Sequence, residues 1–172
     1  MSEYQRRGRQ MEMVLGFAFD DAEKEVVLIQ KQRPEWQKGY LNGIGGKVEK
    51  DEQPYDAMVR EFKEETGITC NNWQFCGRFS CDGGLVYLYK KHFSIAELDY
   101  IDGRISADGE TINKRRVDNL RQAGPRPLDN LHWIIPLLLD NIQYPFYLKY
   151  NSRGGCKQEA ESLDRKREKA GE

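Results

Sequence analysis

The sequence predicts an α/β or α+β domain in which helices cover the faces of a mixed sheet. Three features support this prediction. Apolar runs near the start indicate strands, a charged segment in the middle indicates a helix, and an almost wholly apolar segment near the end indicates a buried helix. Strands and helices in this order pack as layers around one core. A chain of 172 residues is long enough for one such domain, which we expect to span residues 10–150.

The first strands are expected to form a hairpin. Residues 11–19 (MEMVLGFAF) and 25–32 (EVVLIQKQ) are rich in branched and aromatic residues, and the acidic stretch 20–23 between them predicts a turn. Residues 1–9 are polar and basic, which predicts a loose tail. The loop 33–39 follows, in which Trp36 either stacks on a ligand or covers the edge of the core.

Two more strands are expected after the charged helix, at 73–81 and 85–95, joined by a glycine turn at 82–84. Residues 99–125 form a long polar connection of a kind that is often functional, with a strand expected around 116–120. The apolar segment 131–142 predicts a helix buried against the sheet with Pro136 in its first turn, and 144–150 predicts the last strand. Residues 151–172 are a charged tail, either disordered or a solvated helix.

Composition narrows the class of protein. The net charge of −1 argues against a dedicated nucleic-acid binder, which is usually basic. No apolar run approaches the roughly 20 residues of a membrane span, and the N-terminus lacks the apolar segment of a secretory signal. The four cysteines lack C-x-x-C spacing, so we expect free thiols, and neither His92 nor His132 completes a metal site with them. We therefore expect a cytoplasmic protein that is a monomer or a homodimer.

The charged helix has clear start and stop signals. Pro54 suits a first helical turn, where its missing N–H is not needed, and Asp51 and Glu52 place negative charge near the positive end of the helix dipole. Gly67 suits the left-handed residue that follows a helix. The expected helix therefore runs from about residue 54 to about residue 66.

Three carboxylates crowd one side of this helix. Glu61, Glu64 and Glu65 project from adjoining positions at about 100° per residue, while Met58 and Phe62 lie on the side that can be buried. Like charges at this spacing cost stability. A hard divalent cation such as Mg²⁺ or Mn²⁺ would relieve that cost, because it prefers oxygen ligands. The alternative is a charged face that is simply solvated.

The same stretch resembles the signature of the Nudix hydrolases. That signature is a glycine, five residues, a glutamate, seven residues, Arg-Glu, an apolar residue, any residue, Glu-Glu, any residue, a glycine and an apolar residue. The matching positions here are Gly46, Glu52, Arg60, Glu61, Phe62, Glu64, Glu65, Gly67 and Ile68. The resemblance implies a Nudix-type α/β/α sandwich with a mixed sheet, and hydrolysis of a nucleoside diphosphate that is linked to another group.

The resemblance also implies how a metal ion would be held. Glu61 and Glu65 are expected to be ligands, Glu64 a further ligand or a supporting carboxylate, and the backbone carbonyl of Gly45 is expected to complete the shell. Arg60 is expected to fix a carboxylate through a charge-assisted pair.

The general base stays open between two acids. Glu61 is one candidate, and Glu110, which lies outside the signature, is the other, either as base or as an additional ligand. The ordinary alternative for Glu110 is a solvated loop acid. Glu52 is expected to act through water or to hold the loop, and Lys47 either contacts phosphate or is a surface lysine.

The flanks of the signature resemble the MutT-like branch, which degrades purine nucleoside triphosphates, including oxidised ones such as 8-oxo-dGTP. The resemblance puts Asn42 at a base contact, which suits an amide because it can donate and accept at once. The other reading is a turn asparagine before Gly43. That branch also reads the base just before the last helix, where this chain has Asp129, Asn130 and Trp133.

The leading hypothesis is thus Mg²⁺-dependent hydrolysis of a nucleoside triphosphate to the monophosphate and pyrophosphate. A second hypothesis keeps the chemistry but changes the substrate to a nucleotide sugar, ADP-ribose, a dinucleotide or an RNA 5′ end. Basic residues at positions 6, 7, 9 and 114–116 favour the RNA option. A third hypothesis is a nucleotide-sensing module without catalysis, against which the complete acidic cluster argues.

Overall fold

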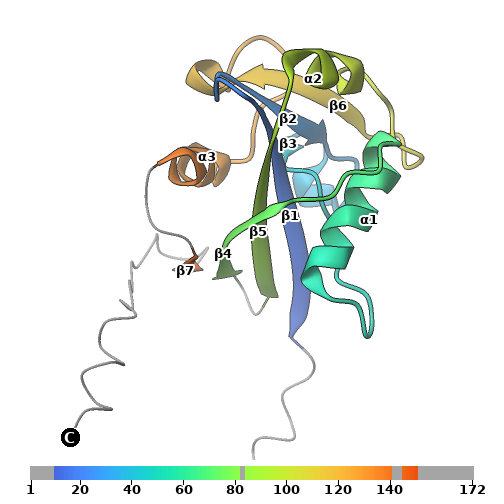
Figure 1. Ribbon diagram of the computed structural model, residues 1–172, viewed down its shortest axis with the longest axis vertical. Helices are drawn as coiled ribbons and strands as arrows, with labels where there is room; N and C mark the ends of the chain where they lie inside the picture. The colour runs from blue at the N-terminus through green and yellow to red at the C-terminus, as the bar shows by residue number, and fades with distance from the viewer. Residues whose placement is uncertain (1–9, 82–83, 141–144, 151–172) are drawn as a thin grey trace, which may run out of the picture.

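Strands of one mixed sheet form the centre of the computed structural model, which describes residues 10–81, 84–140 and 145–150. The strand order is β3-β2-β1-β5-β4-β7, and β6 pairs with β2 (Figure 1). β1 runs parallel to β5 and β4 runs parallel to β7, while the other pairs are antiparallel. The strands are β1 (Met11–Asp20), β2 (Glu25–Gln30), β3 (Leu41–Asn42), β4 (Gln74–Cys81), β5 (Gly84–Phe93), β6 (Thr111–Arg116) and β7 (Phe146–Tyr150). The helices are α1 (Pro54–Thr66), α2 (Ile95–Ile101) and α3 (Leu131–Leu139).

Helices cover both faces of the sheet, which confirms the predicted sandwich. α1 and α3 stand on opposite sides of it in Figure 1, and the core is split in the same way. Because side chains alternate along a strand, Val14 and Ala18 of β1 pack in the cluster that contains α1 and α2. Leu15 and Phe17 pack in the cluster that contains α3.

The helix that carries the acids has the predicted bounds. Pro54 occupies its first turn, and Gly67 ends it in the left-handed conformation with φ of 76°, donating its N–H to the Lys63 carbonyl. Phe62 anchors the buried face, with its ring 5.0 Å from that of Trp73 and 5.8 Å from that of Phe93. The opposite side of α1 is therefore held at a fixed orientation toward the loop before it.

Three sequence predictions are wrong. The sequence predicts a strand over the whole run 85–95, but β5 stops at Phe93 and Ile95 begins α2, whose start is fixed by a capping box between Ser94 and Glu97. The strand expected around 116–120 lies earlier, as β6, and residues 117–119 form a short 3₁₀ helix. Pro136 lies inside α3 instead of its first turn, because the helix already begins at Leu131.

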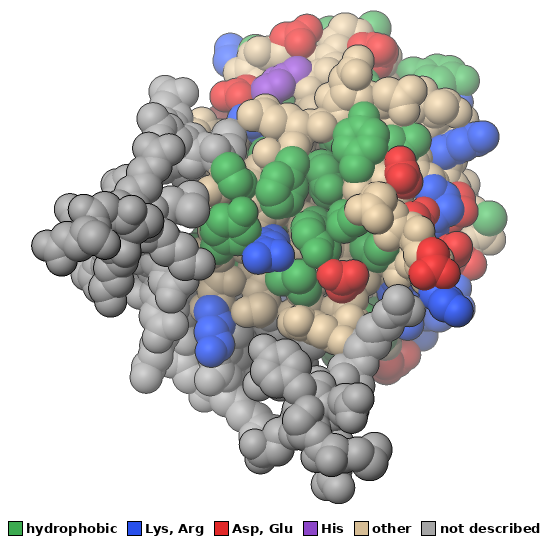
Figure 2. Space-filling view, turned by 60° about the horizontal axis from the view of Figure 1, so that its bottom comes forward, with side chains coloured by type: hydrophobic (Ala, Val, Ile, Leu, Met, Phe, Trp, Pro, Cys, Tyr) green, Lys and Arg blue, Asp and Glu red, His purple; other side chains and the backbone are tan. Residues whose placement is uncertain are grey.

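Other expectations concern the surface and the ends of the chain. Cys70 and Cys76 are buried free thiols, as predicted. The tails at 1–9 and 151–172 lie outside the described residues, as does most of the turn at 82–84. Figure 2 shows hydrophobic side chains gathered in the middle of one face, with charged side chains mostly around them. Among the described helices, none is long and apolar enough to cross a membrane.

Candidate metal and phosphate site

The glycine loop before α1 is bound closely to the first strand. The Val14 N–H donates to the Gly46 carbonyl at 2.9 Å, and Gly16 and Ile44 bond to each other through their backbones. A Cβ on Gly45 would lie 2.1 Å from the Val14 carbonyl oxygen, and one on Gly46 would lie 2.4 Å from a carboxylate oxygen of Glu61. Glycine at both positions lets the loop lie between the strand and the acids of α1.

Arg60 ties this loop to the helix. Its guanidinium donates to both oxygens of Glu52 at 2.8 and 2.9 Å, to the Lys47 carbonyl at 2.9 Å and to Glu61 at 2.9 Å. The hydrogen bond from Arg60 lowers the pKa of Glu52, and the same pairing raises the pKa of Arg60. Glu52 therefore holds the loop. Glu64 also accepts from Arg60, at 3.2 Å, but its side chain is 58% exposed at the rim.

Glu61 and Glu65 are the least exposed acids of the helix, with partly buried side chains that are 14% and 11% exposed. Burial raises the pKa of Glu65 to about 8 and also raises the pKa of Glu61. The Gly45 N–H donates to Glu65 at 3.2 Å. Both carboxylates thus lie beside the glycine loop, where their negative charge is poorly solvated.

Glu110 joins these acids from a distant part of the chain. A tight turn in which the Ser106 hydroxyl accepts from the Glu110 N–H brings it beside β2. Its carboxylate is buried and accepts from Lys31 Nζ at 2.7 Å and from the Gln32 N–H at 2.9 Å. Lys31 Nζ also lies 3.6 Å from Glu65. The structure therefore brings Glu110 close to Glu65, with Lys31 beside both carboxylates.

Lys31 is a site residue that the sequence interpretation missed. Strand alternation could have found it, because Val27 and Ile29 of β2 face the α1 side of the sheet and Lys31 follows with the same parity. Its significance depends on Glu110, 79 positions away, so the local sequence gives no further signal.

The donor atoms suit Mg²⁺ or Mn²⁺. The carboxylate oxygens of Glu61, Glu65 and Glu110 are the hard ligands that such ions prefer, and their burial leaves negative charge to be balanced. As the side chains stand, no three Asp, Glu, His or Cys residues in the described ranges converge tightly enough to hold a metal ion. The ammonium of Lys31 lies between the carboxylates of Glu65 and Glu110 and keeps these two acids apart.

The predicted base contact Asn42 lies in β3, next to the glycine loop. Its Oδ1 accepts from the Gly43 N–H at 2.8 Å, as in a turn, and its Nδ2 donates to the buried Gln37 at 3.2 Å. Trp36, beside Gln37, is 69% exposed and so does not cover the core edge. Lys47 is exposed, and only its backbone has a described bond in the site.

The segment before α3 runs beside β3. Leu41 donates to the Arg126 carbonyl and accepts from the Leu128 N–H, which aligns residues 126–128 with the strand that ends at Asn42. Asp129 is exposed, while Oδ1 of Asn130 is buried without a hydrogen-bond partner among the described residues.

Trp133 has a different environment from the other predicted base contacts. Its ring packs edge-on against Phe79 at 5.7 Å, beside the core cluster of α3. That contact gives Trp133 a packing role.

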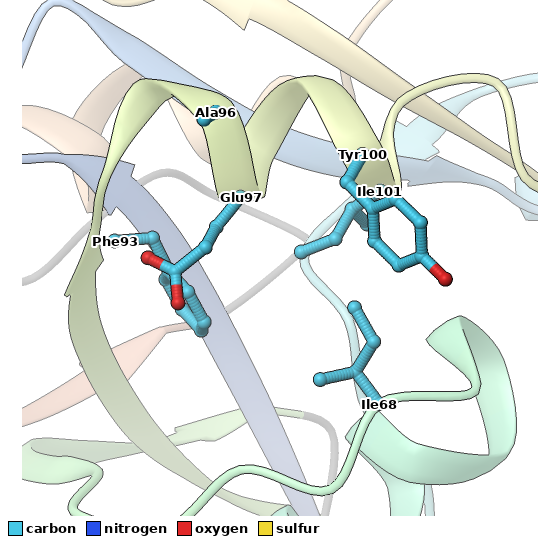
Figure 3. A pocket seen from close by; sticks show the side chains of 6 residues that line it. All are labelled: Ile68, Phe93, Ala96, Glu97, Tyr100 and Ile101. Atoms are coloured by element: carbon cyan, nitrogen blue, oxygen red, sulfur yellow. The ribbon is translucent and has the colours of Figure 1, made fainter.

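Two surface hollows lie near these elements. A polar one of about 450 Å³ is lined by the start of β1 and by residues 47–53 of the loop that Arg60 holds. An apolar one of about 220 Å³ lies between α2 and the segment after α1, where Figure 3 shows Ile68, Phe93 and Tyr100 around it. Its one acid, Glu97, is bonded to Ser94 in the capping box, so this hollow does not suit phosphate.

Curated proteins match parts of the chain. A protein of Bacillus subtilis named "Uncharacterized Nudix hydrolase YvcI" is 41% identical over 56 residues, which is 33% of this chain and 33% of that protein. The methanol dehydrogenase activator of Bacillus methanolicus is 30% identical over 71 residues, covering 39% of this chain and 38% of that protein. The matches thus span only about a third of these relatives.

Solved structures share the fold at low identity. The MutT protein of Bacillus halodurans superimposes with a TM-score of 0.62 at 22% identity, over 82% of this chain and 89% of that one. The NUDIX domain of Shewanella oneidensis NrtR, solved with ADP-ribose, gives 0.59 at 18% identity, over 80% and 97%. Residues 11–136 match the NUDIX domain family model, a range that spans β1 to β6, the glycine loop and the acidic helix. The chain therefore belongs to the Nudix family.

Proposed function

We propose that this chain is a Mg²⁺-dependent pyrophosphohydrolase that cleaves a phosphoric anhydride in a nucleoside diphosphate derivative, with Mn²⁺ as an alternative metal. The observation that carries the proposal is the pair of partly buried carboxylates, Glu61 and Glu65, held against the Gly45–Gly46 loop. Acids with raised pKa values reduce the stability of a fold, so they are retained mainly where a function needs them, which is why they cluster at functional sites.

The residues of the site divide into holding and reacting groups. Glu61 and Glu65 would hold the ion, with Glu64 at the rim as a further ligand and the Gly45 carbonyl completing the shell. The ion would neutralise phosphate charge and activate a water. Arg60 fixes Glu61 by a charge-assisted bond and fixes the loop through Glu52, so the donors stay aligned.

We assign proton abstraction from the attacking water to Glu61. Both oxygens of Glu110 already accept hydrogen bonds from Gln32 and Lys31, whereas Glu61 has a described bond on one oxygen only. Burial raises the pKa of Glu61, which strengthens it as a base. Glu110 is then a candidate additional ligand of the ion, paired with Lys31 in its absence.

For the substrate we propose a purine nucleoside triphosphate, of which 8-oxo-dGTP is an oxidised example, cleaved to the monophosphate and pyrophosphate. Asn42 and Asn130 are the candidate contacts to the base, because amides pair with both donors and acceptors on its edge, and Oδ1 of Asn130 has no hydrogen-bond partner among the described residues. Asp129 is a further candidate contact, Lys47 a candidate phosphate contact, and Trp133 is left to packing.

A second candidate substrate is ADP-ribose. The observation that favours it is the shared fold with the NrtR domain that was solved with this ligand. The two substrates differ in where the second half of the molecule lies, since ADP-ribose needs room for a sugar beyond the diphosphate.

The test is a substrate panel at millimolar Mg²⁺, with products identified by chromatography. The panel holds dGTP, 8-oxo-dGTP, ATP, ADP-ribose, a dinucleoside polyphosphate and a 5′-triphosphate RNA. Release of a nucleoside monophosphate and pyrophosphate from a purine triphosphate supports the proposal. Turnover of ADP-ribose alone would replace the substrate, and tight binding of nucleotides without any turnover would support a sensing module instead.

A further inference from the structure

We propose that Lys31 is the internal counter-cation of Glu65 and Glu110, and that its ammonium competes with the divalent cation for their carboxylates. The inference rests on the proposed function, because it takes these acids to meet the metal ion. It adds a residue outside the family signature that sets how tightly the ion is bound.

The contacts of the two acids follow one pattern. In Glu110, Oε1 accepts from the Gln32 N–H at 2.9 Å and Oε2 accepts from Lys31 Nζ at 2.7 Å. In Glu65, Oε2 accepts from the Gly45 N–H at 3.2 Å and Oε1 lies 3.6 Å from the same ammonium. Each carboxylate thus has one oxygen held by the backbone and the other turned toward Lys31.

The two kinds of donor differ in how easily they can move away from the carboxylates. The N–H groups of Gln32, just after β2, and of Gly45, in the glycine loop, belong to the backbone, whereas a lysine ammonium sits on a flexible stem of four carbons. A cation that approaches the oxygens facing Lys31 therefore meets the ammonium, which can move aside while the backbone donors stay in place.

Burial makes this competition strong. The Lys31 side chain is 15% exposed, and those of Glu65 and Glu110 are 11% and 7% exposed. Charges in such a site interact more strongly than in water, so an ammonium and a divalent ion at neighbouring oxygens repel each other markedly. The same ammonium offsets the repulsion between the acids, so it stabilises the fold while it weakens the binding of the ion.

The test measures Mg²⁺ binding by isothermal titration calorimetry, without nucleotide, in the wild type and three variants. Lys31→Met removes the charge and keeps most of the stem, and Lys31→Arg keeps the charge. Lys38→Met is the matched control, because that lysine is 56% exposed and only weakly paired. We expect Lys31→Met to bind Mg²⁺ about tenfold more tightly, which is about 1.4 kcal/mol, and to melt at a lower temperature in EDTA. Lys31→Arg and Lys38→Met should stay within about threefold of the wild type, a difference of about 0.65 kcal/mol.

Unchanged or weaker Mg²⁺ binding by Lys31→Met would overturn the inference. If that variant does not fold, the wild type decides the matter through the NMR signal of the Lys31 ε-methylene, assigned with Lys31→Arg. The signal should shift on Mg²⁺ saturation, and an unchanged signal refutes displacement. If the wild type hydrolyses nucleotides but Lys31→Met binds Mg²⁺ no more tightly, only this inference is refuted and the proposed function stands. A wild type without Mg²⁺ binding removes the proposed function as well.

Discussion

Replacing Glu65 with glutamine should stabilise the fold in EDTA while it destroys the site. Burial raises the pKa of this carboxyl to about 8, from an ordinary value of about 4.3. At about 1.4 kcal/mol per pKa unit, the ionised form costs the fold at most roughly 5 kcal/mol. Because Glu61, Glu110 and Lys31 share the same site, we expect the variant to gain about 1–3 kcal/mol, or roughly 3–10 °C in Tm for a chain of this size.

The gain must depend on pH in a fixed direction. Glu65 is neutral in both states at pH values well below its unfolded pKa of about 4.3, so the difference in stability between wild type and variant should be smallest there. As pH rises from about 4.3 to about 8, the wild type loses stability because the carboxyl of Glu65 ionises in the unfolded chain before it ionises in the fold, whereas glutamine does not ionise. The difference in Tm should therefore grow from pH 5 to about pH 8 and be largest at pH 9, above the folded pKa of Glu65.

The assay is thermal unfolding followed by circular dichroism in EDTA at pH 5, 7 and 9, repeated with Mg²⁺ added. Glu35→Gln makes the same chemical change on a side chain that is 89% exposed, and it should leave Tm within about 1 °C, since surface changes cost little. Mg²⁺ should raise the Tm of the wild type and not that of Glu65→Gln. A variant less stable than the wild type at pH 9 would refute the reasoning.

Three further substitutions test other parts of the site. Arg60→Met leaves Glu52 and Glu61 without their shared partner, so urea unfolding should show a loss of about 1–3 kcal/mol and kcat should fall; unchanged kcat would exclude a positioning role. Gly46→Ala puts a Cβ 2.4 Å from Glu61, and displacing that carboxylate should lower kcat about 10²-fold with little change in Tm; a large loss of Tm with normal kcat would contradict this. Asn42→Ala should raise KM for purine nucleotides more than for tripolyphosphate, which has no base; equal changes would mean that Asn42 only supports the turn through Gly43 and Gln37.

The helix of the site was predictable because its signals are local. Pro54 and Gly67 fix its ends through backbone rules that hold in any context, and the structure begins and ends α1 at the expected residues. The capping box of Ser94 and Glu97 is equally local, but it follows an apolar run without a break, and the strand pattern hid it.

Features set by distant contacts were not predictable. β6 has a polar sequence, TINKRR, and is a strand because its backbone pairs with β2. In the same way, Lys31 becomes part of the site through Glu110. Glu110 was a candidate from the sequence, but the sequence did not indicate that its carboxylate accepts hydrogen bonds from Lys31 and Gln32. Periodicity reports which face of an element is buried, whereas partners across the sheet depend on the fold.

The most direct test of the central claim is the rate of hydrolysis of the best substrate as a function of Mg²⁺ concentration, in the wild type and in Glu65→Gln. The account predicts that the wild type is inactive in EDTA and that its rate saturates with Mg²⁺. The rate of the variant should fall by at least roughly 10–100-fold, which is the cost of mutating residues that only support metal ligands. Turnover that persists in EDTA, or a variant whose rate follows the wild-type Mg²⁺ curve, would contradict a metal-dependent hydrolase built on these carboxylates.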